Sequence, residues 1–205
     1  MKPATLAGRP LHDIFHVCAF FRSREEEYRV LAPFLAEGLE GGEKAVYIVD
    51  PDRRAEHKKK LAASIGGDFE KFGPRLDVIT WRETYLQDGV FDPDRMIDTV
   101  EATFAAAVAE GYPRMRICGE MEWVHSGAPG VELLLEYETR CNDVIARAKQ
   151  PAVCCYQVDR LSASLMMDIL RTHPLAIIGG TLYENPFFTP PQQMLAELRQ
   201  RKAAA

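Results

Sequence analysis

The sequence of 205 residues lacks several features that would place it in a familiar class of protein. No apolar run approaches the roughly 20 residues that a membrane-spanning helix needs. The first 13 residues contain no apolar signal segment, so we expect a cytoplasmic protein with no membrane partner. The five cysteines have no CxxC spacing, which favours buried free thiols over disulfides or a zinc site.

Nucleotide-binding motifs are also missing. A P-loop would place GxxxxGK and then Ser or Thr after the first predicted strand, where backbone N–H groups and the lysine cradle phosphate. This chain has Arg22-Ser23-Arg24 there, followed by three glutamates at 25–27 whose charge repels a nucleotide. GxGxxG and the GxSxG elbow of serine hydrolases do not occur either. We therefore predict a protein that is not an enzyme, with no catalytic residue.

What is present is the composition of an ordinary globular domain. Hydrophobic residues make up 47% of the chain and charged residues 27%. We expect one domain over residues 1–205, with its core at about 12–191. The formal net charge of −5 argues against nucleic acid or an anionic membrane as a partner. The basic run at 53–60 lies in a helix-like stretch, and we interpret it as a solvated helix face.

Strand-like and helix-like segments alternate along the chain. The strand-like segments are short and nearly all apolar, at 14–21, 45–49, 76–81, 115–119, 152–158 and 175–178. The helix-like segments lie at 24–40, 51–64, 92–110, 131–149, 159–171 and 192–202. Four of them are expected to begin at caps, which are Ser23, Asp50-Pro51, Asp92-Pro93 and Asp159. This alternation predicts an α/β fold, a three-layer, doubly wound, mainly parallel sheet covered by helices on both faces. The strand order cannot be predicted from the pattern.

Two carboxylates follow the fourth predicted strand. Ligands of open parallel sheets bind beyond the carboxyl ends of the strands, so residues just after each strand are candidates. Glu120 and Glu122 are spaced two apart and would point the same way in an extended chain. Such a pair can bind a metal ion or take a proton. The structural alternative is that one caps a helix or pairs with an arginine, which we favour slightly for Glu122.

Histidine and cysteine alternate on the first predicted strand. His16 and Cys18 face the same way and could ligate a metal ion or haem iron, with Cys118 or Cys154 as a third ligand. A packed cysteine and a hydrogen-bonded histidine are the simpler interpretation, because the spacing does not single out a metal. His173 is interpreted as a turn residue at the entry to the last strand.

Aromatic residues gather near the predicted strand ends. If some of them converge with His16 and Glu120, they form an apolar pocket with few polar groups, which is typical of a small-ligand site. No metal ligand is assigned and the cofactor stays unspecified. The candidate ligand-binding residues are His16, Cys18, Phe20, Trp81, Glu120, Glu122, Trp123 and Tyr156.

The run from His16 to Tyr28 resembles the start of the MEDS domain, the methanogen/methylotroph DcmR sensory domain. Further sequence motifs of that domain follow in the same order, and together they cover about residues 12–191. They are Gly42-Glu43-Lys44-Ala45, Asp50-Pro51, Thr80-Trp81 with Tyr85, Phe91-Asp92-Pro93, Gly119-Glu120-Met121-Glu122-Trp123, Tyr137-Glu138, Arg171-Thr172-His173-Pro174, Gly179-Gly180 and Asn185-Pro186-Phe187. The resemblance implies a RecA-like fold without the phosphate loop, and a sensory module of prokaryotic signalling that recognises simple hydrocarbon derivatives.

The resemblance also shapes the expected partners. About 14 residues follow Pro191, too few for an output domain. We therefore expect a stand-alone sensor of a small organic ligand, which signals to a separate kinase or transcription regulator or associates with itself. Three alternatives stay open: a degenerate nucleotide-binding module that acts as regulator or scaffold, a haem or metal sensor, and an enzyme that uses Glu120 with His16.

Overall fold

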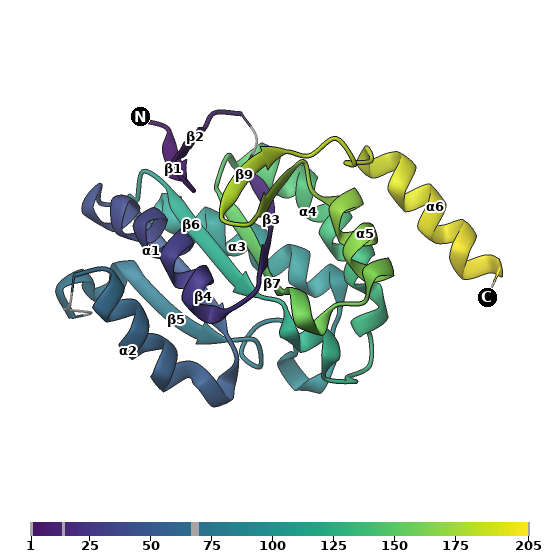
Figure 1. The fold of residues 1–205 in the computed structure, drawn as a ribbon, viewed down its shortest axis with the longest axis horizontal. Helices are drawn as coiled ribbons and strands as arrows, with labels where there is room; N and C mark the ends of the chain where they lie inside the picture. Colours follow the sequence, from purple (N-terminus) through teal and green to yellow (C-terminus); the bar gives the residue numbers. More distant parts are fainter. Residues whose placement is uncertain (1, 14, 67–69, 205) are drawn as a thin grey trace.

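A seven-stranded sheet forms the centre of the computed structural model, which describes residues 2–13, 15–66 and 70–204 (Figure 1). The spatial order is β5-β4-β6-β7-β3-β8-β9, with β9 antiparallel to β8 and the other pairings parallel. The strands are β3 (His16–Phe21), β4 (Lys44–Val49), β5 (Leu76–Thr80), β6 (Met115–Glu120), β7 (Ala152–Gln157), β8 (Leu175–Ile178) and β9 (Thr181–Glu184). Ile14, predicted to begin the first strand, lies outside the described residues.

Helices cover both faces of this sheet, as the sequence predicts. The α-helices are α1 (Arg24–Glu40), α2 (Arg54–Ser64), α3 (Pro93–Ala109), α4 (Leu134–Ala148), α5 (Ala163–Thr172) and α6 (Pro191–Ala204). Short 3₁₀ helices lie at Pro51–Arg53, Glu70–Arg75, Gln87–Gly89, Glu122–His125, Val131–Leu133 and Val158–Arg160. Helices α1 and α2 lie on one face and α3, α4 and α5 on the other (Figure 1). The three-layer, mainly parallel α/β fold is confirmed.

The winding of the chain explains which helix lies on which face. From β3 the chain moves through β4 to the edge strand β5, and it then returns through β6 and β7 to β8. Because parallel crossovers are right-handed, helices of the outward path and helices of the return path lie on opposite faces. The two faces are thereby built from different parts of the sequence.

Two of the four predicted helix caps are found at the start of the predicted helix. Ser23 caps α1 by accepting from the Glu26 N–H at 3.2 Å, and Asp92 caps α3 in front of Pro93. Asp50-Pro51 opens a 3₁₀ turn ahead of α2 rather than α2 itself. Helix α5 is capped by Ser162, whereas the sequence suggested Asp159, because residues 158–160 form a separate 3₁₀ turn.

Two hairpins were not predicted. Strands β1 (Ala4–Leu6) and β2 (Arg9–Leu11) pair antiparallel and bury Ala4 and Leu6 against the core. The second hairpin joins β8 to β9 through Gly179-Gly180, both at positive φ. Strands of three or four residues are too short to show a clear alternation of apolar and polar residues, so the sequence pattern does not predict them. Within the described residues, no helix is long and apolar enough to cross a membrane.

Strand alternation divides the core into two layers. On β3, Val17, Ala19 and Phe21 pack towards α1 and α2, whereas Cys18 and Phe20 pack towards α3 and α4. The same alternation on β7 sends Cys155 and Gln157 towards α1 and α2, and Cys154 and Tyr156 towards α3 and α4. Buried polar groups therefore form separate clusters on the two faces.

Candidate functional site

The first cluster surrounds Arg24 at the carboxyl ends of the strands, on the face of α1 and α2. We call Arg24, Glu27, Glu120 and Glu122 the Arg24 cluster. The guanidinium lies 2.6 Å from Glu27, 2.8 Å from Glu120 and 2.8 Å from Glu122. All three carboxylates are buried, and Glu120 also accepts from the Asp50 backbone N–H at 2.9 Å. One cation thus holds three carboxylates together.

The charged groups of the Arg24 cluster shift one another's pKa values. Burial, and then the charge of Glu27, raise the pKa of Glu120 to about 8. Burial opposes ionisation of Arg24, but the three carboxylates outweigh it and raise the pKa of Arg24. His57 accepts from or donates to the Tyr28 hydroxyl at 2.9 Å, and burial followed by the charge of Arg24 lowers its pKa to about 3. The carboxylates outnumber the guanidinium here, so a phosphate group would be repelled.

The second cluster lies on the other face of the sheet, and its four members are all buried. We call His16, Glu138, Cys154 and His173 the His–Cys–Glu cluster. One ligand-type atom from each lies within 4.8 Å of the others. The Oε2 atom of Glu138 is 3.3 Å from His16 Nε2, 3.3 Å from His173 Nε2 and 3.4 Å from Cys154 Sγ. Strands β3 and β7, helix α4 and the α5–β8 junction each supply one member.

Neighbouring groups fix the orientation of this cluster. The Tyr156 hydroxyl donates to Glu138 Oε1 at 2.6 Å, which leaves Oε2 for the histidines. His16 Nδ1 lies 3.1 Å from Asn142 Oδ1, and His173 Nδ1 lies 3.0 Å from the Ile169 carbonyl oxygen. The carboxylate thus accepts from Tyr156 at one oxygen and faces both imidazole rings with the other.

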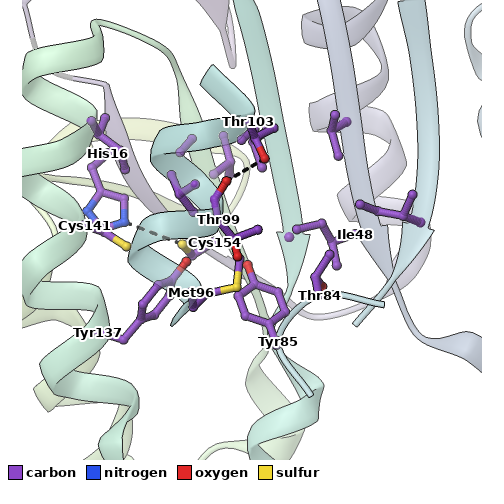
Figure 2. Close-up of a pocket in the computed structure, with 18 residues that line it drawn as sticks. His16, Ile48, Thr84, Tyr85, Met96, Thr99, Thr103, Tyr137, Cys141 and Cys154 are labelled. Atoms are coloured by element: carbon purple, nitrogen blue, oxygen red, sulfur yellow. Dashed lines mark hydrogen bonds between the residues drawn. The ribbon is translucent and has the colours of Figure 1, made fainter. Parts of the chain in front are cut away.

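A cavity of about 60 Å³ borders the His–Cys–Glu cluster, between the sheet and helices α3 and α4 (Figure 2). His16 and Cys154 belong both to the cluster and to the cavity wall. Most of the lining is aliphatic or aromatic, and Thr84, Thr99 and Thr103 add hydroxyls at half-buried positions. These hydroxyls donate to backbone carbonyls four residues earlier, so their lone pairs can still accept.

Gly119 shapes one wall of the cavity. A Cβ atom at this position would lie 2.7 Å from the Tyr85 hydroxyl oxygen. Glycine therefore lets the Tyr85 ring lie close against β6, and Figure 2 shows this ring beside Met96 and Thr84. Behind it, Trp123 stacks on Tyr85 with ring centroids 4.9 Å apart.

The structure divides the predicted ligand-binding residues between the two faces. His16 and Tyr156 lie at the His–Cys–Glu cluster, and Phe20 stacks on Tyr156 at 5.8 Å. Cys18 shares that face, where its thiol donates to the Leu175 carbonyl oxygen at 3.6 Å.

The remaining predicted residues lie elsewhere. Glu120 and Glu122 belong to the Arg24 cluster, so Glu120 and His16 are not brought together. Trp123 is fully buried among aromatic rings, and Trp81 is half-buried beneath the Arg82 guanidinium.

Four residues of the two clusters, Arg24, Glu27, Glu138 and His173, were not predicted as site residues. Arg24 lies in the first turn of α1, where basic residues are usually solvated. Glu138 lies in mid-helix, where hydrophobic periodicity does not show that a charged side chain points inward. His173 was interpreted as a turn residue. The signal that could have found the last two was present in the motifs Tyr137-Glu138 and Arg171-Thr172-His173-Pro174.

Known proteins resemble this chain in sequence and in fold. It is 25% identical over 170 residues to the transcriptional repressor DcmR of Methylorubrum extorquens, across 79% of this chain and 58% of the repressor. The chain thus matches a little over half the length of that relative. The flagellar accessory protein FlaH of Methanocaldococcus jannaschii has a similar fold, with a TM-score of 0.50 and 11% identity over 87% of this chain and 82% of FlaH.

This likeness to FlaH concerns the fold alone, and the sequence after β3 of the present chain has no phosphate loop. The sequence profile of the MEDS family, described as the methanogen/methylotroph, DcmR sensory domain, matches residues 15–174. That match covers most of the sheet, both polar clusters and the cavity. The chain therefore belongs to the MEDS family of sensory domains.

Proposed function

We propose that this sensory domain binds a small hydrocarbon derivative in the cavity between the sheet and helices α3 and α4. The cavity itself carries the proposal. A volume of about 60 Å³ has room for a few water molecules, which suits a ligand of a few non-hydrogen atoms. Its apolar walls favour carbon or halogen atoms, and the threonine lone pairs would accept from a hydroxyl or amine.

A nucleotide is a poorer candidate for this protein. The Arg24 cluster fills the carboxyl end of the sheet with buried carboxylates, where a phosphate would need cations and free N–H groups. The likeness to FlaH concerns the fold and does not favour a nucleotide by itself. The same argument supports a binding module rather than an ATP-hydrolysing enzyme.

Signalling would follow from a shift between conformations. A ligand that binds one arrangement of α3 and α4 better than another changes the population of the two. Helix α4 contacts both α3 and α6, so a change at the cavity can reach the surface at α6. We propose that a separate kinase or transcription regulator, or a second copy of the chain, recognises that surface.

A thermal-shift panel on the purified chain tests the proposal. Short alcohols, halogenated alkanes and small acids are compared with ATP and magnesium. A ligand at 100 times its dissociation constant stabilises the folded state by about 2.7 kcal/mol. Thr99→Leu narrows the cavity and should abolish the shift, whereas Ala106→Leu on the exposed side of α3 should preserve it. Stabilisation by ATP alone would contradict the proposal.

A further inference from the structure

We infer that His16, Glu138, Cys154 and His173 form a tetrahedral site for a divalent transition-metal ion, zinc in particular, at the wall of the cavity. The inference goes beyond the proposed function, since the metal site can exist whether or not a hydrocarbon derivative binds beside it. The four side chains come from four separate parts of the chain, which the fold brings together in a buried location.

The distances between the four side chains match a tetrahedral zinc site. Zinc lies about 2.0–2.1 Å from nitrogen or oxygen and about 2.3 Å from sulfur, so the edges of its tetrahedron measure about 3.3–3.7 Å. Glu138 Oε2 lies 3.3 Å from each histidine Nε2 atom and 3.4 Å from Cys154 Sγ. Cys154 Sγ lies 3.6 Å from His16 Nε2. Four of the six edges thus have the expected length.

Hydrogen bonds on the far side of each ring determine where the lone pairs point. The Asn142 side-chain nitrogen lies within reach of the backbone carbonyls of Glu138, Thr139 and Thr172, so its Oδ1 faces His16 and must accept from Nδ1–H. The Ile169 carbonyl likewise accepts from His173 Nδ1–H. Both neutral rings therefore direct an Nε2 lone pair at the Glu138 carboxylate.

Such an arrangement favours a cation between the two rings and the carboxylate. Lone pairs aimed at a carboxylate repel it, and His173 Nε2 is buried without a hydrogen-bond partner. Protonating both rings would place two positive charges within a ring-centroid distance of 4.1 Å. A divalent ion between Glu138 and a Cys154 thiolate gives a site with zero net charge, which suits a buried location.

The surrounding residues are those of a supported metal site. Metal-ligating histidines usually donate their other N–H to a carbonyl or carboxylate, which fixes the ring. Asn142 and the Ile169 carbonyl do this here, and Tyr156 holds the second oxygen of Glu138. Imidazole, thiolate and carboxylate together suit zinc better than magnesium or calcium.

Metal content of the full chain, expressed without a histidine tag, tests the inference. We expect about one zinc ion per chain by inductively coupled plasma mass spectrometry. Cys154→Ser and His173→Ala should lower it to less than a tenth. Cys18→Ser, a buried cysteine on the same face outside the cluster, is the matched control and should keep its zinc. Circular dichroism reports whether each variant is folded.

Cobalt provides a second measurement that does not depend on the variants. Co²⁺ added to the metal-free wild type should give the intense visible bands of a four-coordinate ion and a thiolate-to-cobalt charge-transfer band. Tyr156→Phe should weaken metal affinity about tenfold, as loss of a supporting hydrogen bond does. A folded wild type that carries no stoichiometric metal and gives no charge-transfer band with Co²⁺ would overturn the inference.

Discussion

Buried carboxylates are stabilised in different ways on the two faces of the sheet. On the face of α1 and α2, the Arg24 guanidinium supplies the cation for three buried carboxylates. On the face of α3 and α4, the Glu138 carboxylate instead meets two imidazole rings, the Cys154 thiol and the Tyr156 hydroxyl. The chain itself supplies the cation of the first cluster, whereas we propose that a metal ion from outside the chain supplies the cation of the second.

The difference separates structure from function. The three carboxylates of the Arg24 cluster are held within the chain by one guanidinium, and their excess negative charge disfavours an anionic ligand, although the cluster lies where ligands of open α/β sheets usually bind. The other cluster adjoins the cavity of about 60 Å³. We therefore assign a structural role to the Arg24 cluster and propose the opposite face as the sensing site.

Removing the cation of the first face should have the largest effect. Arg24→Ala leaves three buried carboxylates without their guanidinium, and the free energy of unfolding should fall by about 3–5 kcal/mol. Urea denaturation at pH 8 measures it. Arg29→Ala on the exposed side of the same helix is the control and should change stability by less than about 0.5 kcal/mol. A loss below about 1 kcal/mol for Arg24→Ala would contradict the structural role.

Acid should lower the stability of the protein by protonating His57, which lies on the same face. Its folded pKa of about 3 lies below its unfolded value, so the stability it contributes is present above about pH 6.5 and is lost as pH falls. Between pH 6.5 and 5 the wild type should lose about 2 kcal/mol relative to His57→Gln. His12→Gln, at an exposed histidine, should behave as the wild type. Parallel stability curves for wild type and His57→Gln would show that His57 is not buried as a neutral ring.

Glu120 should act in the opposite direction with pH. Its folded pKa of about 8 lies above the unfolded value, so its contribution is complete below about pH 4.3 and is lost as pH rises towards 8. Because Glu27 and Glu120 titrate together, we expect a modest gain of about 1 kcal/mol for Glu120→Gln over the wild type at pH 8 relative to pH 5. Glu40→Gln, at an exposed carboxylate, should show no such gain. A difference between Glu120→Gln and wild type that does not change with pH would refute the assignment.

The fold could be predicted because its long strands and helices carry strong local signals. The apolar runs of β3, β4 and β7 and the caps at Ser23 and Asp92 are local features that need no knowledge of the partner strands. The strand order and the hairpins β1–β2 and β8–β9 depend on contacts between distant or very short segments. Periodicity carries no information about those contacts.

The sites could be predicted only in part, for a related reason. Strand alternation placed His16 and Cys18 on one face, as the structure has them. Alternation within one strand does not say which face another strand's residues share, so it could not separate His16 from Glu120. Nor could it show that Glu138 points from mid-helix towards Tyr156 and both histidines.

Methyl NMR would test most directly which face senses the ligand. Isoleucine probes lie on both sides of the sheet: Ile48, Ile117 and Ile145 line the cavity, whereas Ile65 and Ile177 lie in the core beneath α1 and α2. A stabilising small organic molecule should shift the resonances of Ile48, Ile117 and Ile145 and leave Ile65 and Ile177 nearly unchanged. Shifts confined to Ile65 and Ile177, or shifts produced by ATP at the Arg24 cluster alone, would contradict a sensing site on the face of α3 and α4.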